Sequence, residues 1–138
     1  MHKLYLGLGA NMGDCRRTIS DAIEEIEEQI GVVVRRSALY DTEPWGFKSD
    51  NRFVNAVVCC DTKLPPREVL ERSKAIERKL GRVEKTVNGC YQDRVIDIDI
   101  LLYDDIKVDE PDLKIPHPLM RERDFVMIPL REITEAGG

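Results

Sequence analysis

The sequence lacks several features, and each absence excludes a class of protein. No apolar run approaches the roughly 20 residues that cross a bilayer, and the first residues show no signal-peptide pattern. The four cysteines form no Cys-x-x-Cys pair, which argues against a zinc site or a disulfide framework. The net charge of −5 argues against a general nucleic-acid binder. We therefore expect a cytoplasmic protein that has neither a membrane nor a nucleic acid as a partner.

The length and the order of the patterned segments predict one α+β domain. The 138 residues suffice for one core but not for two, so we expect a single domain over residues 1–138. Strand-like segments cover residues 3–9, 32–41, 53–61 and 94–103. Two helical stripes lie between them, formed by Ile19, Ala22, Ile23, Ile26 and Ile30, and by Val69, Ser73, Ile76 and Leu80. The order βαββαβ is that of a ferredoxin-like fold.

A ferredoxin-like fold has an antiparallel sheet with both helices on one face, so we expect the other face to be free for a ligand. After residue 103 the chain reads as an irregular tail, broken by Pro111, Pro116, Pro118 and Pro129. The glycines at positions 7 and 9 give a weak hint of dinucleotide binding, but the third glycine, Gly13, comes one residue late. We interpret these glycines as part of a tight turn.

Two carboxylates stand one residue apart in the last strand-like segment. Strand side chains alternate between faces, so Asp97 and Asp99 point one way, about 7 Å apart. The aliphatic residues of the segment, Ile96, Ile98, Ile100 and Leu102, then point the other way. Like charges so close favour a bound cation, and Mg²⁺ takes carboxylate oxygens together with substrate phosphates. The alternative is the solvated acidic face of an edge strand.

Four segments, read together, carry a resemblance that spans nearly the whole chain. They cover residues 8–14, 40–57, 76–101 and 115–130, and they include Gly9-Ala10-Asn11, Arg94-Val95-Ile96-Asp97-Ile98-Asp99 and Ile115-Pro116-His117-Pro118. In this order and spacing they resemble the 6-hydroxymethyl-7,8-dihydropterin pyrophosphokinase family of folate biosynthesis. The resemblance implies a ferredoxin-like enzyme that moves the β,γ-diphosphate of ATP onto the hydroxymethyl group of a reduced pterin and releases AMP.

The resemblance also implies roles for individual residues. Asp97 and Asp99 would bind two Mg²⁺, and Asp97 is the candidate to take the hydroxymethyl proton. Arg82 and Arg94 complete the catalytic set. The pterin would be bound by Thr42, Pro44, Trp45, Phe53, Asn55 and Phe125, and ATP by Glu77, Arg82, Lys85, Arg94, Ile100, His117 and Arg123. Without the resemblance, the phenylalanines would be read as core residues, Glu77 as a helix-surface residue, and the basic residues as exposed charges.

The chain departs from the family pattern in one region. Glu84 stands where the family usually has a second arginine, and Cys90-Tyr91-Gln92-Asp93 replaces the common Arg-Trp-Gly-Pro. We expect the loop at residues 83–93 to be mobile when empty and to close over ATP. These departures leave a catalytically degenerate pterin- or nucleotide-binding module as the alternative function. We expect a monomer that can associate with neighbouring folate-pathway enzymes.

Overall fold

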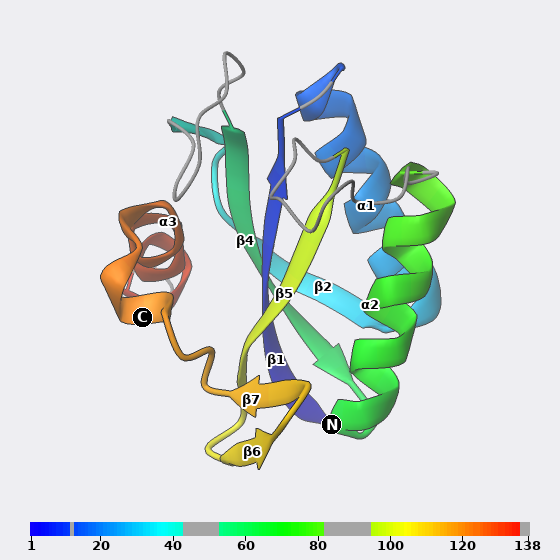
Figure 1. Cartoon of the computed structure of the whole chain (residues 1–138), viewed down its shortest axis with the longest axis vertical. Helices are drawn as coiled ribbons and strands as arrows, with labels where there is room; N and C mark the ends of the chain where they lie inside the picture. The colour runs from blue at the N-terminus through cyan, green and yellow to red at the C-terminus, as the bar shows by residue number, and fades with distance from the viewer. Residues whose placement is uncertain (12, 43–52, 82–94, 136–138) are drawn as a thin grey trace.

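Strand β1 (His2–Ala10) lies at the centre of an antiparallel sheet in the order β2–β4–β1–β5, and β3 extends the sheet by pairing with β4 (Figure 1). The computed structural model describes residues 1–11, 13–42, 53–81 and 95–135. The other strands of this sheet are β2 (Gly31–Arg36), β3 (Tyr40–Thr42), β4 (Phe53–Thr62) and β5 (Asp97–Tyr103). The helices are α1 (Cys15–Gln29), α2 (Pro66–Gly81) and α3 (Asp124–Glu135). This arrangement confirms the predicted ferredoxin-like α+β fold.

Helices α1 and α2 cover one face of the sheet, as the stripes predict (Figure 1). Residues of the first stripe, among them Ile19 and Ile26, are fully buried against the alternating leucines of β1. On α2, Val69 and Ile76 join the same core. Helix α1 begins after Asp14, whose side chain accepts a hydrogen bond from the Arg17 N–H at 3.2 Å. Among the described residues, no helix is both long and apolar enough to span a membrane.

The opposite face is partly covered by α3, which the sequence analysis missed. Val126, Leu130 and Ile133 pack with Val57 and Leu101 in a second apolar cluster. Their spacing of four and three residues is helical, but Pro129 stands between them. A proline inside a helix removes one backbone hydrogen bond and usually breaks the helix. Here the burial of the apolar side against β4 outweighs that loss, so the expected irregular tail is wrong over this segment.

The predicted strand over residues 32–41 is two strands, β2 and β3, separated at residues 37–39. Ser37 explains the break. Its N–H donates to the Val57 carbonyl at 2.9 Å, and its hydroxyl oxygen accepts from the Val57 N–H at 3.0 Å. A side chain thus replaces a backbone carbonyl in the ladder, and the backbone leaves the regular strand path.

The pairing of β1 with β5 contains a bulge that reverses part of the predicted side-chain alternation. Tyr5 pairs with Leu102 and Leu6 with Ile100, so Leu101 is the extra residue. Leu101 therefore faces the cluster under α3, and Leu102 packs against that cluster rather than with the isoleucines. The expected position of Leu102 is wrong, whereas Ile96, Ile98 and Ile100 lie in the α1–α2 core as predicted.

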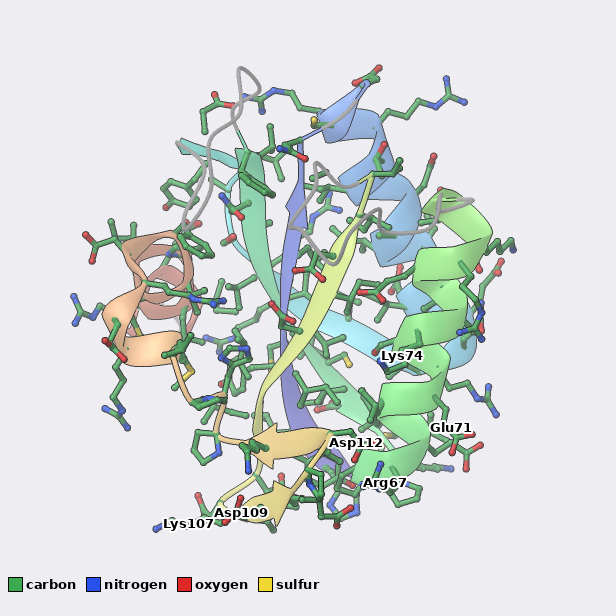
Figure 2. All side chains as sticks on the ribbon, viewed as in Figure 1. Arg67, Glu71, Lys74, Lys107, Asp109 and Asp112 are labelled. Carbon is green, nitrogen blue, oxygen red and sulfur yellow. The ribbon has the colours of Figure 1, made fainter. Side chains whose placement is uncertain are left out.

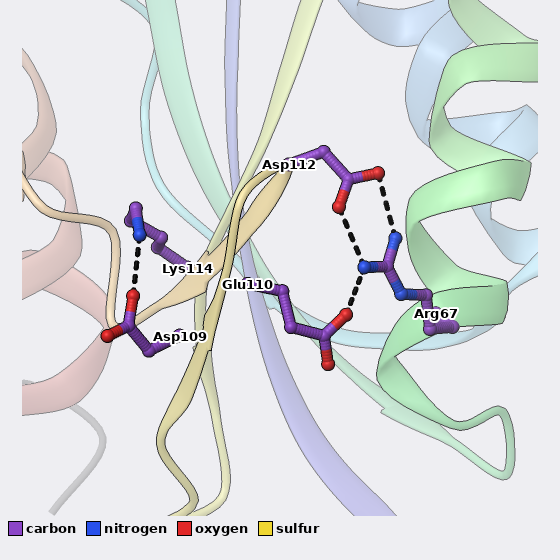
Figure 3. A network of polar contacts seen from close by, with 5 residues as sticks. All are labelled: Arg67, Asp109, Glu110, Asp112 and Lys114. Atoms are coloured by element: carbon purple, nitrogen blue, oxygen red, sulfur yellow. Dashed lines mark hydrogen bonds and ion pairs between the residues drawn. The ribbon is translucent and has the colours of Figure 1, made fainter.

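A small hairpin formed by β6 (Val108–Glu110) and β7 (Leu113–Ile115) is tied to the start of α2. Arg67 donates from two nitrogens to the carboxylate of Asp112 at 2.9 and 2.7 Å, and it also pairs with Glu110 (Figure 3). Figure 2 shows Asp109 on the side of the hairpin away from α2. Asp109 pairs with Lys114 at 2.5 Å, within the hairpin. A single 3-10 turn, Met120–Glu122, then leads into α3.

Candidate active site

A row of four residues crosses the sheet on the α3 side. Tyr40 of β3 pairs with Asn55 of β4, which pairs with Gly9 of β1, which pairs with Asp97 of β5. Directly paired residues of antiparallel strands project from the same face. The neighbours of this row, such as Leu8 and Ile98, lie in the α1–α2 core. The row therefore places a buried amide and a carboxylate on one face, with a glycine between them.

Asp97 and Asp99 share this face, as the alternation predicts. Both are only partly buried, and they stand directly opposite Gly9 and Gly7 of β1. The two glycines therefore lie within β1 and not in the tight turn that the sequence analysis expected. Because neither glycine has a side chain, side chains of the neighbouring strands lie close to the β1 backbone there, Leu101 at Gly7 and Asn55 at Gly9.

Glu77 of α2 holds the strand that carries the two aspartates. Its Oε2 atom accepts a hydrogen bond from the N–H of Ile98 at 2.7 Å. Strand β5 is at the edge of the sheet, so its outward N–H groups need partners other than a neighbouring strand. Glu77 supplies one at the residue between Asp97 and Asp99, which fixes the backbone from which both carboxylates project.

The two carboxylates fit Mg²⁺ better than a metal that needs an all-protein cage. Within the described residues, no group of three or more His, Cys, Asp or Glu side chains could hold an ion. Mg²⁺ is commonly bound by one or two carboxylates, with water and substrate phosphate oxygens completing its shell. Asp97 and Asp99, partly exposed on one face, provide that donor set.

His117 lies beside the end of β5 with its ring oriented by the backbone. Its N–H donates to the Leu101 carbonyl at 3.1 Å, and its Nδ1 accepts from the Leu119 N–H at 3.3 Å. A neutral ring whose Nδ1 accepts carries its proton on Nε2. Burial lowers the pKa of His117, the charge of Arg123 lowers it further, and the charge of Asp97 raises it in part. The side chain is therefore a neutral Nε2–H donor near pH 7.

Arg123 directly precedes α3, and Phe125 lies in its first turn. The guanidinium carbon of Arg123 lies 5.5 Å from the centre of the Phe125 ring, a cation–π arrangement. The charge of Arg123 lowers the pKa of His117 and that of Asp97 raises it, so both lie within electrostatic range of the imidazole ring. The charge of Arg123, directly before α3, and that of Asp97 on β5 therefore act on the same imidazole ring.

The remaining predicted residues divide into three groups. Phe53 and Asn55 lie on β4 with their side chains close to Gly9 of β1, and Asn55 is only 5% exposed. The Ile100 side chain lies in the α1–α2 core, away from the face of the aspartates, and Thr42 ends β3 opposite Phe53. The others lie outside the described residues: Pro44, Trp45, Arg82, Lys85 and Arg94. The predicted lid at residues 83–93 also lies outside them.

A set of long-range contacts that the sequence did not reveal fixes α3. The Glu132 carboxylate accepts hydrogen bonds from the Tyr40 hydroxyl and from the Ala38 N–H, the latter at 3.0 Å to the nearer oxygen. The Arg35 Nη1 atom donates to the Ile133 carbonyl at 3.0 Å. These bonds tie the second half of α3 to the segment around β3, next to the row that contains Asn55. The partners are more than 90 residues apart, so no local pattern could have revealed them.

Comparison with known proteins shows which family the sequence matches. A family model described as 7,8-dihydro-6-hydroxymethylpterin-pyrophosphokinase (HPPK) matches residues 5–135. The 2-amino-4-hydroxy-6-hydroxymethyldihydropteridine pyrophosphokinase of Porphyromonas gingivalis is 47% identical over 132 residues, which cover 95% of this chain and 90% of the relative. The protein of the same name from Methylorubrum extorquens is 45% identical over 135 residues, which cover 97% of this chain and 84% of the relative.

Solved structures show the same fold. The wild-type HPPK-DHPS of Plasmodium falciparum matches 94% of this chain with a TM-score of 0.73 and 17% sequence identity. The match covers 40% of that longer chain. A likeness at this identity concerns the fold, whereas the family model and the relatives concern the sequence itself. On that sequence match, which runs over nearly its whole length, this chain belongs to the HPPK family of pyrophosphokinases.

Proposed function

We propose that the protein catalyses the Mg²⁺-dependent transfer of the β,γ-diphosphate of ATP to 6-hydroxymethyl-7,8-dihydropterin, giving AMP and the pterin diphosphate, in folate biosynthesis. The observation that carries this proposal is the row in which Asn55, Gly9 and Asp97 stand side by side. Two strand spacings separate β4 from β5, about 10 Å. That is the length scale of a two-ring heterocycle with a one-carbon arm. The ring could lie at Asn55 while the arm reaches Asp97.

The phosphate side of the proposed site is formed by β5 and the start of α3. Asp97 and Asp99 would hold two Mg²⁺, which when bound would neutralise the triphosphate and align the attacking and leaving oxygens. Arg123 offers a guanidinium whose fork suits phosphate oxygens. Neutral His117 offers one Nε2–H donor in a fixed direction. Arg82, Arg94 and Lys85 are proposed to complete this side, from residues that the structure does not describe.

The pterin side is formed by β4 and α3. An amide both donates and accepts hydrogen bonds, so Asn55 can read a heterocycle edge that presents both kinds of group. Phe53 lies next to Asn55 on β4, and Phe125 lies on α3, which packs over β4. Aromatic side chains on either side of a flat ring would bind it by stacking.

The reaction needs one bond formed, one broken and one proton moved. The hydroxymethyl oxygen forms a bond to the β-phosphorus as the bond from that phosphorus to the α–β bridging oxygen breaks, and AMP leaves with the bridging oxygen. The hydroxyl proton passes to a carboxylate oxygen of Asp97. Arg123 and the Nε2–H of His117 stabilise negative charge on the phosphate oxygens. Positioning and electrostatics therefore account for most of the expected catalysis.

Phosphorus NMR tests this function directly. The protein is mixed with ATP, Mg²⁺ and 6-hydroxymethyl-7,8-dihydropterin, and the phosphorus signals are followed with time. AMP and a pterin diphosphate are the expected products. ADP would mean transfer of a single phosphoryl group and would contradict the proposal. Binding of both substrates without turnover would favour the degenerate binding module.

A further inference from the structure

The central strand carries glycine at two alternating positions on the ligand face. Gly7 pairs with Val57 and Asp99, and Gly9 pairs with Asn55 and Asp97. Glycine inside a strand is destabilising relative to alanine, so its presence there calls for a reason. One such reason is the close approach of another group to the backbone.

The two glycines differ in what a side chain would meet. A Cβ atom built on Gly9 would lie 2.9 Å from Oδ1 of Asn55, a separation that real Cβ atoms essentially never show. A Cβ atom built on Gly7 would meet only the Leu101 side chain, at 3.4–3.6 Å, which is ordinary contact. The Asn55 amide therefore lies over the backbone of Gly9 in space that any side chain there would take.

We propose that Gly9 is a specificity-determining residue: its missing side chain allows the Asn55 amide to lie across β1, where it reads the edge of the heterocyclic substrate. This inference rests on the proposed function. It adds Gly9 to the pterin side of the proposed site, away from the residues assigned to the phosphates. Asn55 is 5% exposed, Tyr40 is its partner on β3, and Cδ1 of Phe53 lies 3.8 Å from the same built Cβ atom, so a displaced amide would have to move within a buried site. A methyl group at Gly9 would push the amide out of the orientation that the substrate requires.

The expected effect is selective. A displaced hydrogen-bonding group in a buried polar site costs about 10- to 100-fold in affinity for the ligand it reads. The triphosphate is held by other residues, on β5 and at the start of α3, so nucleotide binding is expected to change by less than about twofold. A general loss of stability would instead lower the affinity for both the pterin and the nucleotide.

The test compares Gly9→Ala with Gly7→Ala, a matched change on the same strand and face. Calorimetry gives the dissociation constant of 6-hydroxymethyl-7,8-dihydropterin in the presence of Mg²⁺ and a non-hydrolysable ATP analogue, and separately that of the analogue. NMR follows the side-chain NH₂ signals of Asn55. We expect Gly9→Ala to shift these signals and weaken the pterin 10- to 100-fold, whereas Gly7→Ala does neither.

Unchanged pterin affinity in Gly9→Ala, or an equal loss in Gly7→Ala, would overturn the proposal. If Gly9→Ala does not fold, the double variant Gly9→Ala/Asn55→Ser removes the 2.9 Å contact. Recovery of the fold would support the proposal, and no recovery would overturn it. A wild-type protein that binds the nucleotide but no pterin would overturn the proposed function itself. If the wild-type protein binds the pterin and Gly9→Ala binds it with equal affinity, only this inference would be overturned.

Discussion

The Glu77 carboxylate on α2 accepts a hydrogen bond from the N–H of Ile98 at 2.7 Å, so a helix holds the edge strand between its two aspartates. The resemblance places Glu77 near the nucleotide, and the contact with Ile98 gives it a second role, as a positioning residue for β5. The two roles make different predictions.

Replacing Glu77 with alanine is expected to destabilise the protein by about 1–3 kcal/mol, because the Ile98 N–H loses its charged acceptor. Hydrogen exchange at the Ile98 amide is expected to accelerate, and denaturant unfolding gives the change in free energy. Glu71→Ala, an exposed position on the same helix, serves as the control. If Glu77→Ala weakened ATP binding but left exchange at Ile98 unchanged, the positioning role would be wrong.

His117 is expected to titrate below its ordinary value of 6.5, because burial and the charge of Arg123 disfavour the protonated ring. As the pH falls, the unfolded chain takes up this proton first. The contribution of neutral His117 to stability is therefore complete above 6.5 and is lost as the pH falls through the folded pKa.

The ring signals of His117 in an NMR titration check this directly. The chain has only two histidines, so a His2→Gln variant assigns the signals. Arg123→Gln is expected to raise the pKa of His117, and Asp97→Asn to lower it. Titration of His117 at or above 6.5 in the unaltered protein would contradict the neutral Nε2–H donor.

Glu132 is expected to position α3. Replacing it with alanine removes the acceptor of the Tyr40 hydroxyl and the Ala38 N–H and should cost about 1–2 kcal/mol. Because α3 carries Phe125, we expect the KM for the pterin to rise more than the KM for ATP. Arg131→Ala, an exposed neighbour on α3, is the control. An equal rise in both KM values would indicate a general loss of structure instead.

Acid should release the β6–β7 hairpin from α2. The hydrogen bonds from Arg67 lower the pKa of Asp112, so this contact stabilises the fold above the ordinary aspartate pKa and is lost as the pH falls through the folded value. Asp112→Asn should speed hydrogen exchange in the hairpin at neutral pH. Asp109→Asn, which loses only a pair within the hairpin, should leave the docking on α2 unchanged (Figure 3). The same exchange rates in both variants would contradict a docking role for Arg67.

Local patterns predicted the parts of the fold that depend on local periodicity. The apolar stripe of α1 is buried at each position from Ile19 to Ile26 that the 3.6-residue period selects. The shared face of Asp97 and Asp99 follows from the two-residue period of a strand. In both cases the information lies within a few residues.

The features that sequence reasoning missed depend on distant partners. The bulge at Leu101 is a property of the pairing with β1, and no residue of β5 alone specifies it. Helix α3 forms despite Pro129 because its apolar side packs on β4. The role of Gly9 depends on the Asn55 side chain, 46 residues later in the chain and opposite in the sheet. Glycines at alternating positions of a strand are a signal that another group approaches the backbone closely. Their interpretation as part of a turn left that signal unused.

We propose above all that Asp97 and Asp99 together bind the metal ions that hold the triphosphate. Electron paramagnetic resonance of Mn²⁺, used in place of Mg²⁺, measures metal bound by the protein with a non-hydrolysable ATP analogue. Asp97→Asn and Asp99→Asn should each weaken Mn²⁺ binding at least about tenfold. Asp105→Asn, which removes the same charge from an exposed turn, should leave it unchanged. Equal Mn²⁺ binding in all four proteins would contradict the account.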